Sequence, residues 1–587
     1  MKDKIVRAIY LTVGLIILLM LLGEIIVSQL VYTTAKSWAE QISLSGQASR
    51  FTPILFQKIK TQTLWMIPFL VLFFLAWLLF RKKIEEEFLW YLPKEGDWKS
   101  LKSSLTLSPY ETYGLLVFLL IGIGLRLIRM QGIMESDEAL SYLQYAQKPW
   151  AAVSVYIPDT NNHIFHTLLV SLITRLFGDS PWAIRSVDFV FGIVLIPTIF
   201  FVARLIWGEG KSAAKWISVV ILTASPLICE YSANSRGYTL QIFLGLIMWG
   251  LIVQICQGRR DLVMILGAVT ALVLWTNITS VYLFGGAVLT LLGCFLLEKK
   301  GRLIDIIFYM VFTGILSLFL WSPVLVGSGL ASILATPEAN PIAGLQPTSI
   351  LSRFINLEDV FSLSLGWPIG FGLILIPFVA GITRAPLVWR WLVLGHSISI
   401  ILITNVFRAT PPTRIWLFFI PLVALMVEGG VQSLLNLSKG ISKHSGWIIG
   451  VLGVGYLTWV FPLVLDFGPS HKEISTFARK VADDLPNGQQ ILIQIEKSPY
   501  KEKQTKKTYN NIHTIRYYLI RAGVPYKSFI WKDREKTAST WLIAIHQASV
   551  PSSLSGQKNG SWDLVIGPYT LKKHWNGMND KPEPGRM

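Results

Sequence analysis

Two adjacent carboxylates, Asp137 and Glu138, lie just after an apolar run that covers residues 113–128. A carboxylate at a reaction centre can accept a proton, which is general-base chemistry. Charged side chains are costly near hydrocarbon, so they usually face water, a cavity or a partner. The pair therefore indicates either a functional site at a membrane boundary or an acidic loop exposed to water.

Three other polar groups also lie at the ends of apolar runs. They are the sequence Asn161-Asn162-His163, residues 231–238 with Arg236 and Tyr238, and residues 408–414 with Arg408 and Arg414. A consistent membrane topology places all three groups on the same side as Asp137.

Each of these groups also has a structural interpretation. Asn162 and His163 could be a helix cap and a polar surface residue. Arg236 could pair with Glu230 or with lipid headgroups, Tyr238 could belong to an interfacial aromatic belt, and Arg408 and Arg414 could be interfacial anchors.

The composition predicts the setting in which these residues lie. The chain has 587 residues, of which 52% are hydrophobic. The apolar runs cover residues 9–32, 64–80, 113–128, 164–177, 183–207, 213–228, 240–256, 262–275, 278–297, 303–326, 367–382, 391–407, 416–427 and 447–465. Runs of this kind predict a polytopic α-helical membrane protein with roughly 11 to 13 spans.

The net charge of +18 fits a membrane protein whose Lys and Arg residues collect in cytoplasmic loops and near anionic lipids. We therefore expect membrane lipids as partners and no nucleic acid. The three cysteines, Cys229, Cys256 and Cys294, lie in or beside apolar runs and have neither the pattern of a disulfide framework nor metal-ligand spacing.

The basic clusters predict the orientation of the chain. Lys2, Lys4 and Arg7 indicate a cytoplasmic start followed by an uncleaved signal anchor. The loop that carries Asp137 then lies outside the cytoplasm. The alternation of spans fits the basic clusters of the later loops only if Ile164–Phe177 does not cross the membrane, or if one of the neighbouring apolar runs does not.

Three regions follow from these patterns. Residues 1–111 are predicted to form a two-span extension with a cytoplasmic connector, and residues 112–466 the main membrane domain. Residues 467–587 are predicted to form a small soluble α/β domain outside the cytoplasm. Its expected helices are residues 472–484 and 511–522, and its expected strands are residues 490–495, 540–545 and 563–566.

The order of motifs between residues 113 and 255 resembles that of the GT-C superfamily of membrane glycosyltransferases. Within it, the chain is most similar to the branch of protein O-mannosyltransferases and lipid A aminoarabinose transferases. The resemblance depends on the ordered set of the Asp-Glu pair, Asn161-Asn162-His163, Leu176-Phe177-Gly178-Asp179-Ser180, Arg185, Arg204-Leu205-Ile206-Trp207-Gly208, Pro226 and residues 231–238. In the later spans it includes only Arg414 followed by Pro421.

The resemblance implies a polyprenyl-phosphate-linked sugar donor and transfer on the outer face, with inversion at the sugar. Asp137 is the expected general base, and Glu138 is a second candidate or an orienting group. Arg236, Arg408 and Arg414 are the expected ligands of the donor phosphate. The other expected substrate-binding residues are Asn162, His163 and Tyr238.

The resemblance also implies no cofactor and no metal, and the expected location is the plasma (inner) membrane. The alternative for Asp137, Glu138 and His163 is a divalent-metal site that holds the donor phosphate. The alternative functions are a lipid or solute transporter or flippase, which predicts an internal repeat, and a non-catalytic membrane scaffold. The sequence specifies neither the sugar nor the acceptor.

Overall fold

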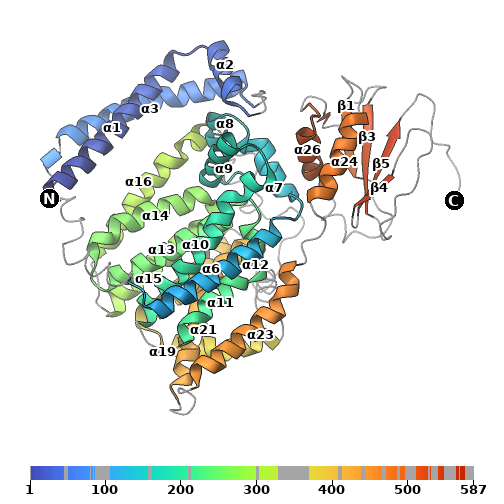
Figure 1. The fold of residues 1–587 in the computed structure, drawn as a ribbon. Coiled ribbons are helices and arrows are strands. Elements are labelled where there is room, and N and C mark those ends of the chain that lie inside the picture. The colour runs from blue at the N-terminus through green and yellow to red at the C-terminus, as the bar shows by residue number, and fades with distance from the viewer. Residues whose placement is uncertain are drawn as a thin grey trace. The chain divides into compact units, whose positions relative to one another are not determined.

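The computed structural model describes residues 2–44, 50–79, 81–82, 85, 106–155, 161–208, 213–298, 303–327, 369–406, 413–437, 444–465, 471–484, 490–495, 511–525, 529–530, 540–547, 563–566 and 569–575. The chain divides into two compact units (Figure 1). The larger unit contains Met1–Arg126 and Tyr145–Val464, and the smaller unit contains Leu127–Gln144 and Leu465–Met587. Residues 127–144 therefore belong with the C-terminal part of the chain.

The larger unit is a bundle of helices. They are α1 (Lys2–Gln29), α2 (Tyr32–Ile42), α3 (Pro53–Leu79), α6 (Pro109–Arg129), α8 (Trp150–Val155), α9 (Ile164–Phe177), α10 (Pro181–Trp207), α11 (Ile217–Ala224), α12 (Pro226–Ser232), α13 (Tyr238–Cys256), α14 (Val263–Thr276), α15 (Val281–Glu298), α16 (Leu303–Gly327), α19 (Ile369–Arg384), α20 (Leu387–Val406), α21 (Phe419–Leu435) and α23 (Ser445–Leu465). In the described part of the chain, nine helices are long and apolar enough to cross a membrane.

The apolar run at residues 213–228, which was predicted as one span, is not one continuous helix. A 3-10 turn, Ala213–Trp216, leads into α11, and α11 ends before Ser225 and Pro226. Proline disfavours a helical conformation in the residue before it, and Ser225 has the non-helical angles φ −54° and ψ 122°. Helix α9 has 14 residues, as its apolar run predicted, which is shorter than a full span.

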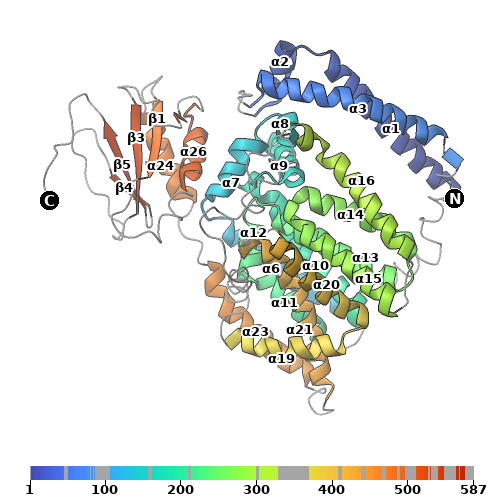
Figure 2. The same ribbon diagram turned by 180° about the vertical axis from the view of Figure 1, so that it is seen from behind.

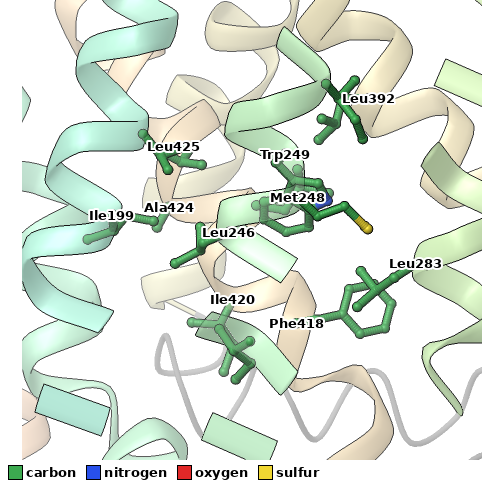
Figure 3. Packing of buried hydrophobic residues seen from close by; sticks show 14 of the residues in the cluster. Ile199, Leu246, Met248, Trp249, Leu283, Leu392, Phe418, Ile420, Ala424 and Leu425 are labelled. Carbon is green, nitrogen blue, oxygen red and sulfur yellow. The ribbon is translucent and has the colours of Figure 1, made fainter. Parts of the chain in front are cut away.

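The core of the larger unit surrounds α13, which is apolar on all sides and buried along most of its length. Figure 3 shows this packing, with labelled side chains from α10, α13, α15, α20 and α21 and from Phe418. Glycines let helices α19 and α21 approach closely. A Cβ atom built on Gly430 would lie 1.6 Å from the carbonyl oxygen of Pro377. Small residues are the usual solution where helices pack inside lipid.

The N-terminal extension packs on the rest of the larger unit. Helices α1 and α3 lie side by side, and the Tyr10 hydroxyl donates to the Trp77 carbonyl oxygen at 2.7 Å (Figures 1 and 2). Beyond α2, the backbone N–H of Leu44 donates to the Gln147 carbonyl at 3.2 Å. The Lys58 ammonium donates to the Gly327 carbonyl at 2.7 Å. The extension is thus attached to the ends of core elements.

The smaller unit combines helices with one sheet. The helices are α7 (Ser136–Ser141), α24 (His471–Asp484) and α26 (Asn511–Arg521). The strands are β1 (Gln490–Ile495), β2 (Phe529–Ile530), β3 (Thr540–Gln547), β4 (Asp563–Ile566) and β5 (Tyr569–Trp575), in the order β2-β1-β3-β5-β4. Strand β1 is parallel to β2 and β3, whereas β5 is antiparallel to β3 and β4. Helices α24 and α26 contact each other on one face of the sheet (Figures 1 and 2).

Strands β1, β3 and β4 lie where the sequence predicted strands. Strands β2 and β5 were not predicted, because β2 has only two residues and β5 contains Lys572, Lys573 and His574. That residues 467–587 form a separate soluble domain outside the cytoplasm stays a prediction.

Candidate active site

Helix α7 carries both carboxylates of the predicted catalytic pair. Glu135 precedes the helix, and its side chain accepts from the backbone N–H of Glu138. In return, Oε2 of Glu138 accepts from the backbone N–H of Glu135 at 3.1 Å, which completes a capping box. Glu138 is fully buried. Its visible role is to fix the first turn of α7, and its catalytic role stays a prediction.

Asp137 is half-buried in that first turn, and its charge acts on His513 of α26. Burial and the positive charge of Arg516 lower the pKa of His513 to about 4, and the opposing effect of Asp137 is smaller. His513 is therefore a neutral imidazole at neutral pH. Sequence reasoning did not select it, because more than 370 residues of chain separate it from Asp137.

Asn162 and His163 lie just before α9, and both are buried. The Asn162 amide donates to the Val153 carbonyl oxygen at 2.8 Å and so joins the start of α9 to the end of α8. His163 occupies the N-cap position of α9, but its side chain does not cap the helix. Instead, its ring meets the ring of Tyr238 edge-on, with 5.3 Å between centroids.

Arg236 and Tyr238 come together with His163 in the larger unit. The guanidinium carbon of Arg236 lies 6.0 Å from the centroid of the Tyr238 ring, and Tyr231 packs edge-on against the same ring at 5.1 Å. Arg236 and Tyr238 are only 4% and 3% exposed. Such burial is inconsistent with an aromatic-belt role for Tyr238, because belt residues lie at the surface.

Asp188, a buried hydrogen-bond acceptor next to the segment that carries Arg236 and Tyr238, was not predicted from the sequence. Asp188 of α10 is fully buried and accepts hydrogen bonds from His166 Nε2 at 2.5 Å, Thr239 Oγ1 at 2.8 Å and the backbone N–H of Gly237 at 3.1 Å. Gly237 has φ +69°, and a Cβ atom there would lie 2.9 Å from Cβ and Cγ of His166. Asp188 and His166 thus position the turn that carries Arg236.

A signal for these two residues was present in the sequence. His166 and Asp188 are ionisable residues inside apolar runs, where such residues are rare and usually functional. The predicted site residues all lie at or beyond the ends of apolar runs, so neither His166 nor Asp188 was among them.

The structure describes one of the two predicted arginines of the later spans. Arg414 is half-buried in the 3-10 turn Thr413–Phe418, which leads directly into α21. Arg408 lies outside the described residues. Among the residues that the structure describes, no group of three or more His, Cys, Asp or Glu side chains could hold a metal ion.

Comparison with known proteins agrees with the predicted resemblance. Residues 162–326 match the family described as dolichyl-phosphate-mannose-protein mannosyltransferase. This range contains Asn162, His163, Arg236 and Tyr238, and it begins after Asp137. No curated protein sequence matches the chain.

Solved structures give the fold. The apo structure of ArnT from Cupriavidus metallidurans is 12% identical, with a TM-score of 0.52 over 79% of this chain and 98% of that one. The same protein bound to undecaprenyl phosphate is 12% identical, with a TM-score of 0.49 over the same shares. The Archaeoglobus fulgidus oligosaccharyltransferase, in complex with Zn and sulfate, is 12% identical, with a TM-score of 0.45 over 69% of this chain and 61% of that one.

The larger part of the chain therefore has the fold of ArnT, and the resemblance to GT-C membrane glycosyltransferases is confirmed. The chain is an integral membrane protein with several spans.

Proposed function

We propose that this protein is a glycosyltransferase that moves a sugar from a polyprenyl-phosphate carrier to an acceptor on the extracytoplasmic face of the membrane. The strongest support is the match of residues 162–326 to a family described by its dolichyl-phosphate sugar donor, because dolichyl phosphate is a polyprenyl phosphate. The buried group of His163, Arg236 and Tyr238 lies within that range. A guanidinium and an imidazole that both pack against one phenol ring suit a phosphate that carries a sugar.

The proposed reaction is a direct displacement. The hydroxyl oxygen of the acceptor attacks the anomeric carbon, the bond from that carbon to the phosphate oxygen breaks, and the phosphate leaves with the electron pair. The hydroxyl proton passes to Asp137. Arg236, Arg408 and Arg414 stabilise the negative charge of the leaving phosphate, so the reaction needs no metal ion.

The remaining residues bind and orient the reactants. Glu138 fixes the first turn of α7, which carries Asp137. Asn162, His163 and Tyr238 bind the sugar or the phosphate in the larger unit. The acceptor is a lipid, a glycan or a protein.

The test measures transfer from a panel of synthetic polyprenyl-phosphate monosaccharides with radiolabelled sugars, using the purified full-length protein in detergent. Asp137→Asn runs beside Asp483→Asn, which changes an exposed carboxylate on α24 in the same way. We expect sugar consumption by the native protein and by Asp483→Asn, near-complete loss in Asp137→Asn, and no effect of EDTA.

Each other outcome removes a part of the proposal. If no donor in the panel is consumed, the enzyme is not of this class, and a transporter or a scaffold has to be considered. If Asp137→Asn retains activity, Asp137 is not the base. If EDTA abolishes the activity, the divalent-metal alternative replaces the metal-independent mechanism.

We also propose that residues 467–587 form a soluble domain outside the cytoplasm, that residues 1–111 and 112–466 are the two preceding regions, and that the location is the plasma membrane. The three native cysteines are buried, so Asp483→Cys introduces an exposed thiol. A membrane-impermeant maleimide should label this variant in intact cells. Labelling that requires broken cells would place α24 in the cytoplasm.

A further inference from the structure

Helix α26 holds the chain just before the proposed base. The backbone N–H of Met134 donates to the Tyr518 hydroxyl at 3.2 Å, and the Met134 carbonyl accepts from Thr514 Oγ1 at 2.9 Å. Met134 is fully buried, and Thr514 and Tyr518 are at most 2% exposed. Both backbone polar groups of one residue, Met134, are therefore bound by side chains from a segment about 380 residues away.

The spacing on α26 explains how one helix makes both contacts. Thr514 and Tyr518 are four residues apart, so they lie on the same face of the helix. Between them, Tyr517 packs edge-on against Tyr142, with 5.9 Å between ring centroids. Met134 precedes α7 and Tyr142 follows it, so α26 holds the chain at both ends of α7.

Helix α7 needs such support because it has only six residues. Isolated helices of that length are not stable in water, since nucleation costs more than a single turn returns. The capping box satisfies donors within α7 but does not fix the position of the helix. The position of Asp137, the second residue of α7, therefore depends on the contacts that α26 makes.

We infer that α26 is the positioning element of the proposed base, and that Thr514 and Tyr518 fix Asp137 by holding both backbone polar groups of Met134. This inference rests on the proposed transfer function. Thr514 and Tyr518 are positioning residues, because they bind the backbone of the α7 segment and act on the reaction only through Asp137.

The test uses isosteric variants of the full-length protein in detergent. Tyr518→Phe removes the acceptor for the Met134 N–H, and Thr514→Val removes the donor to its carbonyl. Thr514→Ser retains that hydroxyl and serves as the conservative variant. Thr458→Val, at an exposed position on α23 where the hydroxyl donates to Val454 in the same helix, is the matched control.

The first readout is hydrogen exchange of peptides that cover residues 130–142, which does not depend on activity. Because each lost neutral bond is worth about tenfold in a local equilibrium, we expect exchange to accelerate roughly tenfold in each single variant and more in the double variant. Thr514→Ser and Thr458→Val should exchange like the native protein.

The second readout is the kinetics of transfer. We expect kcat to fall roughly tenfold in each single variant, with the donor KM unchanged, because α26 positions the base and does not bind the donor. When Asp137 is already Asn, the same substitutions should have no further effect on residual transfer. A contact that serves only stability would give the same proportional loss in both backgrounds.

The outcomes separate the inference from the proposed function. Unchanged exchange in the double variant overturns the inference, and so does faster exchange with unchanged kcat. If the native protein transfers no sugar while exchange accelerates as expected, the proposed function fails, and the contact of α26 with α7 is reduced to a structural one.

Discussion

Replacement of Asp188 by Asn should weaken the hydrogen bonds that hold the turn carrying Arg236. The Asp188 carboxylate accepts three hydrogen bonds, from His166, Thr239 and the backbone of Gly237. Asparagine has a single acceptor oxygen, and its amide group donates. The amide NH2 group must therefore face either His166 or the pair of Thr239 and Gly237. The donors that it faces lose their acceptor.

The size of the effect follows from these three bonds. The loss of one hydrogen bond to a carboxylate costs about 1.5–3 kcal/mol, and the other two bonds weaken because a neutral acceptor replaces a charged one. Asparagine is neutral and costs less to bury than a carboxylate, which offsets part of this loss. We expect a net loss of about 2–3 kcal/mol, which raises the population of the displaced turn roughly 30- to 150-fold.

Two assays measure this loss. A thiol-reactive dye should report unfolding, because all three cysteines are buried, and the unfolding temperature of Asp188→Asn should fall. Transfer from the polyprenyl-phosphate donor should lose a similar factor in kcat/KM, since Arg236 is a proposed phosphate ligand.

A graded series makes the result specific. Thr239→Val removes one of the three donors and should cost about 1–2 kcal/mol. Ser186→Ala, two residues before Asp188 in α10, is the control, because among the described residues its hydroxyl bonds only to Ala183 in its own helix. The reasoning is refuted if Asp188→Asn matches Ser186→Ala in both assays, or if Thr239→Val costs more than Asp188→Asn.

Three further predictions concern single positions. Gly237→Ala should cost about 2 kcal/mol or more and impair transfer, because alanine is strained at φ +69° and its Cβ would contact His166, and native-like activity would contradict this. Gly430→Ala should cost at least about 1–3 kcal/mol, because its Cβ would overlap the Pro377 carbonyl, and an unchanged melting temperature would contradict it. Burial, with a smaller effect of a nearby arginine, lowers the pKa of Lys148 from 10.5 to about 8. Between those values the unfolded chain binds a proton that the folded chain does not, so stability should rise with pH. Tryptophan-fluorescence melts should show this rise, and Lys148→Met should abolish it; a variant that keeps the full rise would contradict the assignment.

The sequence predicted most of the membrane helices because hydropathy alone decides which segments can lie in lipid. It did not predict the break at Ser225, because apolar composition continues through it and only Pro226 signals the interruption. The resemblance selected His163, Arg236 and Tyr238, which the structure brings together. The grouping of these residues could not be predicted from composition or spacing.

The residues that support the candidate site were harder to predict than the candidate catalytic and binding residues themselves. The sequence shows Asp188 only as an ionisable residue inside an apolar run, and it does not indicate that the partner of Asp188 is the backbone N–H of Gly237. The contacts of Thr514 and Tyr518 with Met134 join segments about 380 residues apart, and no local pattern reports such a pairing. The extra strands β2 and β5 depend in the same way on their neighbours in the sheet.

The contact between Met134 and Thr514 also determines the order of events during synthesis of the chain. Ribosomes add roughly 5 to 20 residues per second, so the α7 segment waits roughly 20 to 80 seconds after its own synthesis for its partner helix to emerge. By then the described membrane helices, α23 included, have all been made. A nascent chain that stops short of α26 therefore carries every one of those helices and an unsupported Asp137. Membrane insertion and acquisition of the proposed activity are therefore separate events, and translation of residues 466–521 lies between them.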